Sequence, residues 1–321
     1  MLITLAYLFA MVAYLVLRLL FGGTFWWLAL LNTFAIHTFV PAFVLLPITA
    51  ALRLWRDVIR LGLVALLGII WFGPFFQPVS APQPTGNPQL TVVTFNMRHK
   101  QNGNLDTVID WLAQSESDIV LLQEVPEIYS DGIDALREIY PYQQLFPKTR
   151  LTLSRYPFVD TTERYVVIEV QGQEVAVYNV HFTMPVRWEG RFGIRPSTPI
   201  IGIAVNYDET QRNADIRALL NMLEDQPLPH IVGGDFNLSQ HSIIYSDLAL
   251  VLTDSYRRTS SGLGATWPSN FPMLRIDYIW HNPGLRSLMA EVGPDLASDH
   301  LPVIATLEVV LPPGASEVPT E

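Results

Sequence analysis

Residues 90–125 read LTVVTFNMRHKQNGNLDTVIDWLAQSESDIVLLQEV, and this stretch decides the fold. Its first seven residues are rich in β-branched and aromatic side chains, which is typical of a strand. From Leu105 to Ala113 the apolar residues recur with helical spacing, and the run at 118–125 has the composition of a buried strand. A strand, a helix and a second strand in this order predict a layered α/β or α+β domain.

Strand and helix patterns continue to the end of the chain. Further strands are expected at 164–170, 174–182, 230–236, 275–280 and 301–309, with a helix from about Glu209 to Leu223. The stretch PVSAPQPTGNP at 78–88 carries four prolines, which favour an extended spacer over a helix. We therefore expect a membrane region at 1–77, a Pro-rich linker at 78–89, a catalytic domain at 90–310 and a solvated tail at 311–321.

Composition and charge divide the chain in the same place. Half of the 321 residues are hydrophobic and 16% are charged, and the apolar excess is concentrated before residue 80. Residues 1–80 hold four arginines and one aspartate, so the overall net charge of −10 leaves −13 for the remainder. This acidic remainder argues against a large basic surface for nonspecific duplex DNA. With no cysteine, disulfides, thiolate metal sites and a cysteine nucleophile are excluded.

Three apolar runs predict an N-terminal region of about three transmembrane helices. The runs are Leu2–Phe21, Phe25–Leu52 and the shorter Leu61–Phe76, and a helix needs about 20 apolar residues to cross a bilayer. Arginines 53, 56 and 60 lie between the second and third runs, which places that loop in the cytoplasm by the positive-inside rule. With three spans the catalytic domain is extracytoplasmic. If the third run lies on the membrane surface, the domain is cytoplasmic instead.

Polar side chains recur where the predicted strands end. They are Asn96, Glu124, His181, Asp235, Asn237, Asp277, Asp299 and His300. Each has an ordinary structural explanation alone, as a turn, cap or core residue, but together they predict convergence on one edge of a sheet sandwich. Oxygen ligands without cysteine suit Mg²⁺ or Mn²⁺.

Seven motifs, taken in order, resemble those of the endonuclease/exonuclease/phosphatase superfamily, the DNase I-like proteins. They are TFNMR (94–98), LLQEV (121–125), LSRYPF (153–158), YNVHF (178–182), GGDFN (233–237), RIDYIW (275–280) and SDHLPV (298–303). The resemblance implies a four-layer α/β sandwich of two packed mixed β-sheets flanked by helices. That superfamily includes deoxyribonucleases, abasic-site endonucleases, neutral sphingomyelinases and inositol polyphosphate 5-phosphatases, so the resemblance implies a phosphoester hydrolase without specifying its substrate.

The resemblance also implies roles for the matching positions. Asn96 and Glu124 would bind the metal, with Glu124 as the principal Mg²⁺ ligand and Asp299 beside it. Asp235 would orient or deprotonate the attacking water, and Asn237 would hold the phosphate or the nucleophile.

The remaining matched positions would act on the phosphate. His300 would contact the scissile phosphate, with Asp277 fixing its ring, and His181 would assist the leaving oxygen. Arg98 would bind substrate as in the deoxyribonuclease-like pattern; abasic-site enzymes have an acidic residue there, so one metal or two remain open.

Two further features bear on the substrate. The long connection Met184–Asn206 contains Arg187, Trp188, Arg191, Phe192 and Arg195, which suit phosphate or lipid headgroups if the segment is more than a solvated insertion. Trp267 would cover a substrate groove or only the edge of the core.

Three functions remain open from the sequence. The first is a membrane-anchored Mg²⁺-dependent phosphoesterase that acts on lipid headgroups or small phosphate esters, with the bilayer and its phosphate-ester substrate as partners and no obligate protein partner. The second is a membrane-tethered nuclease acting on DNA or RNA, and the third is a catalytically inactive binding module. The tether and the acidic domain favour the first.

Overall fold

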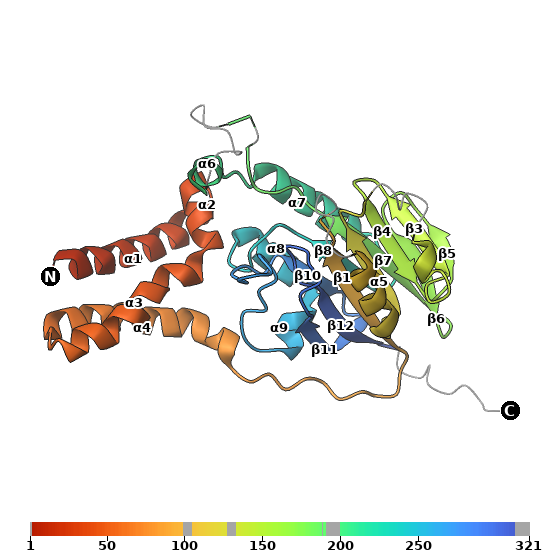
Figure 1. Cartoon of the computed structure of the whole chain (residues 1–321), viewed down its shortest axis with the longest axis horizontal. Coiled ribbons are helices and arrows are strands. Elements are labelled where there is room, and N and C mark those ends of the chain that lie inside the picture. Colours follow the sequence, from red (N-terminus) through yellow and green to blue (C-terminus); the bar gives the residue numbers. More distant parts are fainter. Residues whose placement is uncertain (1, 99–104, 127–132, 188, 191–199, 312–321) are drawn as a thin grey trace. The chain divides into compact units, whose positions relative to one another are not determined.

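The computed structural model describes residues 2–98, 105–126, 133–187, 189–190 and 200–311 (Figure 1). The chain forms two compact units that are discontinuous in sequence. The helical unit combines residues 1–77 with 184–214 and 238–247, and the sandwich unit combines 78–183, 215–237 and 248–321. Two segments from the stretch 90–310 therefore pack with the N-terminal helices.

The sandwich unit contains two six-stranded sheets among its described residues. The first has the order β11 (Leu285–Val292), β12 (Val303–Val309), β1 (Gln89–Asn96), β2 (Ile119–Gln123), β4 (Arg150–Ser154) and β3 (Tyr142–Phe146). The second has the order β5 (Phe158–Thr161), β6 (Val166–Val170), β7 (Gln173–His181), β8 (His230–Asp235), β10 (Asp277–His281) and β9 (Thr253–Asp254). Both sheets are mixed, because β1–β2 and β7–β8 pair in parallel whereas their neighbours pair antiparallel.

Alternation along the strands builds the layers of the first sheet. Leu90 and Val92 of β1 pack in the core shared with residues of β6 and β7. Val93 and Phe95 belong to a second cluster with Val108 and Leu112 of helix α5 (Leu105–Gln114). Since successive side chains of a strand point to opposite faces, one face of the sheet meets the other sheet and the opposite face is covered by α5. The strand–helix–strand prediction is confirmed.

Helix α7 (Thr210–Glu224) lies near the predicted range and ends on the outer side of the second sheet. Val177 of β7 points into the core between the sheets, so its neighbour Tyr178 points outward. Gln226, just after α7, donates a hydrogen bond from Nε2 to the Tyr178 hydroxyl at 2.8 Å. Two mixed sheets flanked by helices are therefore confirmed, with the short helices η3 (Asp134–Leu136), α8 (Ile243–Val251) and α9 (Ser255–Thr259) in the connections.

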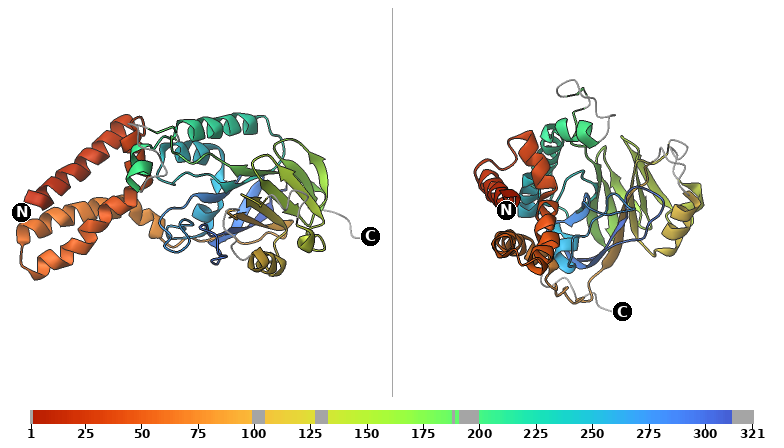
Figure 2. Two further views of the ribbon diagram at one scale, coloured as in Figure 1. Left: turned by 45° about the horizontal axis from the view of Figure 1, so that its top comes forward. Right: turned by 60° about the vertical axis from the view of Figure 1, so that its left-hand side comes forward.

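The helical unit is built around four N-terminal helices (Figure 2). They are α1 (Leu2–Phe21), α2 (Trp26–Thr33), α3 (Ala35–Ala51) and α4 (Trp55–Phe72), followed by the 3₁₀ turn η1 (Gly73–Phe76). Among the described residues, α1 and α4–η1 are long and apolar enough to cross a membrane, and a third span exists if the bent pair α2–α3 counts as one. The predicted span Phe25–Leu52 is thus interrupted by a bend of 60°.

A tertiary hydrogen bond lies at the bend between α2 and α3. The carbonyl oxygen of Thr33, the last residue of α2, accepts a hydrogen bond from Ser239 Oγ at 3.0 Å. The Thr33 hydroxyl also bonds the Tyr207 hydroxyl at 2.5 Å. Polar groups from segments far along the chain thus satisfy this helix end, which local apolar periodicity does not reveal.

The direction of the long helices follows from their contacts. Thr4 near the start of α1 donates a hydrogen bond to Asp57 near the start of α4, and Tyr14 of α1 stacks on Trp71 near the end of α4 at 6.1 Å. Helices α1 and α4 therefore run parallel to each other, and the chain returns between them through α3.

Candidate active site

The strand register of the second sheet brings three predicted residues into one row. Asp235, the last residue of β8, pairs with His181 of β7 on one side and with Asp277 of β10 on the other. All three lie at the same edge because each terminates or begins its strand there. In the first sheet, Asn96 ends β1 and pairs with Gln123, and Glu124 follows directly. The predicted convergence of strand ends is therefore present in the structure.

Gly234 permits the close approach of β7 and β8 that this row requires. A Cβ atom on Gly234 would lie 1.9 Å from the carbonyl oxygen of Val180, its register partner. Its φ of +152° is also one that residues with side chains rarely adopt. The second glycine of GGDFN is thus a packing requirement beside Asp235.

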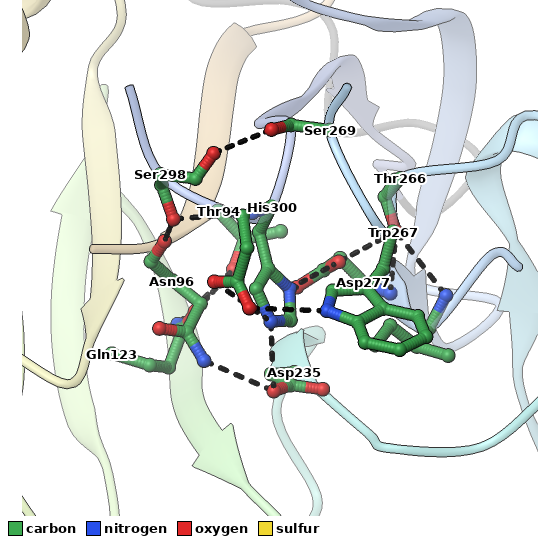
Figure 3. Close-up of polar contacts among 12 residues, drawn as sticks. Thr94, Asn96, Gln123, Asp235, Thr266, Trp267, Ser269, Asp277, Ser298 and His300 are labelled. Atoms are coloured by element: carbon green, nitrogen blue, oxygen red, sulfur yellow. Dashed lines mark hydrogen bonds and ion pairs between the residues drawn. The ribbon is translucent and has the colours of Figure 1, made fainter. Parts of the chain in front are cut away.

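Asp277 and His300 form a buried pair at the centre of the edge (Figure 3). His300 Nδ1 lies 3.0 Å from Asp277 Oδ2, and Thr266 Oγ1 donates to the same carboxylate at 2.6 Å. Burial disfavours the imidazolium, but the carboxylates of Asp277 and Asp235 outweigh it and raise the pKa of His300 to about 10. The ring is held in one orientation and carries a proton at neutral pH.

Asp235 lies beside this pair and joins the two sheets. Its Oδ2 accepts a hydrogen bond from Asn96 Nδ2 at 3.0 Å and lies 3.9 Å from His300 Nε2. Its Oδ1 accepts from the backbone N–H of Asn237 at 2.8 Å. Burial and the nearby Asp277 raise the pKa of Asp235 to about 7, against the opposing effect of His300. A carboxylate with this pKa is suited to accept a proton near neutral pH.

The turns after the strands carry left-handed backbone. Glu124 and Asn237 have φ values of +50° and +48°, a conformation that costs free energy in residues other than glycine and recurs at functional sites. Asn237 is held there by its side chain, which donates to the Phe182 carbonyl at 3.0 Å. Strand ends and strained turns together place these two side chains at the edge.

Glu124 and Asn96 form a second group of oxygen-bearing side chains. Asn96 Nδ2 lies 3.2 Å from Glu124 Oε1, and His181 Nε2 lies 3.7 Å from the same oxygen. The Glu124 side chain is 29% exposed, so it borders solvent, whereas Asn96 is buried. Burial lowers the pKa of His181, so its ring is neutral at pH 7 despite the nearby carboxylate.

Arg98, Asp299 and Trp267 form one hydrogen-bonded group at the site. Asp299 Oδ2 lies 2.9 Å from Arg98 Nη1 and accepts a hydrogen bond from Trp267 Nε1 at 3.2 Å. Asp299 Oδ1 lies 4.0 Å from His300 Nε2. The structure thus brings both predicted substrate-binding residues to Asp299, which was expected beside the metal.

Two groups of side chains offer ligands for a metal. Among the described residues, atoms of Asp235, Asp277 and His300 lie within 4.8 Å of one another and have the composition of a metal site. Asn96 and Glu124 offer the hard oxygen donors that divalent cations of the Mg²⁺ type prefer. The sequence predicts the second group, together with Asp299.

Comparison with known proteins identifies the family. The model of the Endonuclease/Exonuclease/phosphatase family matches residues 93–300, which contain every one of the site residues above. The chain belongs to this family. It is therefore a metal-dependent hydrolase that acts on phosphate ester bonds, and the family uses divalent metals. Comparison with curated proteins finds no match.

Solved structures confirm the fold of this family member. An endonuclease/exonuclease/phosphatase from Beutenbergia cavernae DSM 12333 is 19% identical, with 69% of this chain and 72% of that chain covered and a TM-score of 0.55. Another from Bacteroides vulgatus is 18% identical, with 69% and 99% covered and a TM-score of 0.53. A humanized D. rerio TDP2 is 16% identical, with 69% and 99% covered and a TM-score of 0.52.

Sequence reasoning missed a layer of polar residues beneath the site of this family member. Gln123 Nε2 donates to Asn179 Oδ1 at 2.9 Å, which links β2 of the first sheet to β7 of the second. Asn179 Nδ2 in turn donates to the carbonyl oxygens of Leu122 and Leu151, each at 3.1 Å. These amides stand inside otherwise apolar strands, and that interruption of the apolar run is the signal that identifies them.

Two more residues of this layer lie outside the strands. Thr266 bonds Asp277, and Ser298 Oγ donates to the Asn96 carbonyl at 2.7 Å. Ser298 stands within SDHLPV, but Thr266 follows no strand pattern and only the tertiary structure reveals its partner.

The arginine-rich segment after β7 is described in part. Arg187 forms an ion pair with Asp208 at 2.7 Å within the helical unit. The other residues singled out there lie outside the described residues: Trp188, Arg191, Phe192 and Arg195.

Proposed function

We propose that the protein is a membrane-anchored Mg²⁺-dependent phosphoesterase that acts on lipid headgroups or other small phosphate esters. The observation that carries the proposal is the edge at which the buried Asp277–His300 pair, Asp235, and the Asn96–Glu124 pair meet. This edge combines the charged His300 ring in a fixed orientation, a proton acceptor of suitable pKa and oxygen ligands for a metal within one site. Such a complete arrangement speaks against an inactive binding module.

Each side chain has a distinct part in the proposed reaction. Asp235 accepts the proton of the attacking water, because burial raises its pKa to about 7 and Asn237 fixes one of its oxygens. His300, charged and oriented by Asp277, stabilises the negative charge that develops on the phosphate. Neutral His181, whose Nε2 lies 3.7 Å from Asp235 Oδ2, would donate a hydrogen bond to the leaving oxygen.

Glu124 and Asn96 are the residues that would hold Mg²⁺. Their carboxylate and amide oxygens are hard donors, and Glu124 borders solvent. His300, which Asp277 and Asp235 favour in its charged form, is assigned to the phosphate and not to the metal. When bound, the metal would neutralise non-bridging phosphate oxygens.

The geometry of the helical unit supports an extracytoplasmic domain. Helices α1 and α4 run parallel, so two full spans connected through α3 place residue 2 and residue 77 on opposite sides of the bilayer. The α3–α4 turn and the start of α1 lie at one end, where Arg53, Arg56 and Arg60 favour the cytoplasm. The Pro-rich linker then begins on the outer side.

A nuclease is the second candidate. The guanidinium of Arg98 is anchored by Asp299 yet its side chain is 41% exposed beside the site, which suits contact with a nucleic-acid phosphate. The net charge of −13 outside the first 80 residues disfavours a long polyanion.

The test is Mg²⁺-dependent hydrolysis by the full chain reconstituted in choline-phospholipid vesicles. Substrates are the choline phospholipid of the same vesicles, single-stranded DNA, duplex DNA and an aryl phosphodiester, with Asp235→Asn as the inactive variant and Asp160→Asn, on an exposed strand position, as its matched control. Lipid or aryl ester turnover lost only in Asp235→Asn supports the proposal. Turnover of DNA alone replaces it with the nuclease, and full activity of Asp235→Asn refutes the site assignment.

A further inference from the structure

Helix α2 and the short helix α6 (Ile200–Val205) lie in contact in the helical unit, and both expose apolar side chains. Helix α6 lies in the segment that follows β7, yet it packs against α2. On α2, Leu28 and Thr33 are buried, whereas Trp27 and Leu31 are at least 36% exposed. Ile201 of α6 is 71% exposed. We call this surface, Trp27, Leu31 and Ile201, the α2–α6 surface.

The position of α2 along the chain places this surface at the end of a span. Helix α1 has 20 residues, which at 1.5 Å per residue gives about 30 Å, the thickness of a bilayer core. Helix α2 begins five residues after α1 ends, and it is inclined by 60° to α3. If α1 and α3 cross the bilayer, α2 lies closer to the membrane plane than to its normal.

An arginine and several aromatic rings lie where α1 ends, shortly before α2 in the chain. Arg18, in the last turn of α1, lies over the Trp71 ring at 5.0 Å and donates to the His241 carbonyl at 2.8 Å. His241 in turn contacts the Phe72 and Phe75 rings at 5.1 and 5.4 Å. Tryptophan side chains gather where hydrocarbon meets lipid headgroups, and an arginine near a helix end can extend its charge into the same layer. No Asp, Glu, Lys or Arg occurs from residue 19 to residue 52, so apolar surface continues from α1 through α2 into α3.

We propose that the α2–α6 surface lies in the headgroup layer of the bilayer and that the enzyme draws its phosphate ester from that layer. The proposal rests on the proposed function, because it takes α1 and α4 as spans. A lipid layer fits the surface because its apolar side chains are continuous with the apolar faces of the spans, and shallow insertion of about 5–10 Å is typical of interfacial helices.

Two segments of the helical unit follow directly on residues of the site. Met184, the first residue of the segment that carries α6, follows His181 by three residues, which extend over about 11 Å at most. Leu238, which begins the segment bonded to Thr33, follows Asn237 directly. Two strand ends of the site thus continue directly into segments that pack with the N-terminal helices.

Spin labels on single cysteines test the location of the surface. The chain contains no cysteine, so Leu66→Cys in α4, Ile201→Cys and Asp160→Cys can each be labelled alone in vesicles. Collisions with oxygen report lipid, and collisions with a water-soluble nickel chelate report water. We expect the label at Ile201→Cys to have collision rates with oxygen and with the nickel chelate that lie between those at Leu66→Cys, the reference for a span, and those at Asp160→Cys, the reference for water. A collision rate with the nickel chelate at Ile201→Cys equal to that at Asp160→Cys overturns the proposal. Low collision rates with both reagents also overturn it and indicate that a second copy of the chain covers the surface.

Turnover tests the link to substrate. We expect Ile201→Glu to lower turnover of vesicle phospholipid about tenfold while hydrolysis of a soluble aryl phosphodiester is unchanged, with Ile201→Leu as the control that retains both. An equal rate on vesicles for Ile201→Glu and Ile201→Leu refutes a role in drawing lipid substrate. Absence of Mg²⁺-dependent aryl ester hydrolysis in the unaltered protein refutes the proposed function instead, and the label measurements decide the location of the surface independently.

Discussion

Replacement of Gly234 by alanine should weaken the junction on which the active site depends. The new Cβ would lie 1.9 Å from the Val180 carbonyl oxygen, whereas ordinary contact begins near 3.4 Å. Strands β7 and β8 must therefore separate by roughly 1.5 Å or twist, which weakens about two ladder hydrogen bonds of about 0.5–1.5 kcal/mol each. The unfavourable φ of +152° adds about 1–3 kcal/mol. The sum is about 2–6 kcal/mol of unfolding free energy, a large part of a typical domain's stability.

Gly172→Ala is the matched control for this prediction. Gly172, in the turn between β6 and β7, also has a positive φ (+80°), but a Cβ there meets nothing within 4 Å. The difference between the two variants reports the clash together with the difference in strain between φ values of +152° and +80°. Thermal unfolding of each variant in nanodiscs, followed by tryptophan fluorescence, together with turnover of an aryl phosphodiester, measures both effects. Equal melting temperatures for the two variants would refute the reasoning.

Three further predictions concern the site, its metal and a buried histidine. Thr266→Val removes the hydroxyl that bonds Asp277 and should lower turnover by about 10-fold or more, because His300 loses part of its positioning; Thr266→Ser should restore the rate, and full activity of the valine variant would contradict the role. Chelation by EDTA should abolish turnover, and added Mg²⁺ should restore it. Glu124→Gln should require an Mg²⁺ concentration about 10-fold or more higher for half-maximal rate. An unchanged Mg²⁺ requirement in this variant would show that Glu124 does not bind the metal. Burial lowers the pKa of His281 below its ordinary 6.5, so below pH 6.5 the unfolded chain binds a proton that the folded chain resists. As pH drops from 7.5 to 5.5, the melting temperature of the unaltered protein should therefore fall relative to that of His281→Gln, and parallel curves for the two proteins would contradict it.

The sequence predicts the sandwich well because its strands carry strong local patterns. LTVVTFN and DIVLLQEV have the composition of buried strands. Asn96 ends the first and Glu124 stands next to last in the second, and the structure has both residues at the site edge. Parallel and antiparallel pairing in register then brings Asp235 between His181 and Asp277. A residue at a strand end is therefore predictable, since its neighbours along the chain determine where it lies.

Tertiary partners that share no local pattern were beyond sequence reasoning. Thr266 bonds a carboxylate 11 positions away from within an irregular loop, and nothing in its neighbourhood distinguishes it from other loop hydroxyls. The bend after Thr33 likewise involves Ser239 and Tyr207, both more than 170 residues distant. Hydrophobic periodicity indicates which face of a helix or strand is buried, but not which distant residue forms a hydrogen bond with it.

The sharing of the helical unit between distant segments has a consequence for synthesis. Thr33 and the Ser239 that bonds it are 206 residues apart. At about 5–20 residues per second, roughly 10–40 s pass between their appearances from the ribosome. The N-terminal helices are therefore synthesised well before the segment that completes their packing. The helical unit can be completed only after most of the hydrolase has been made.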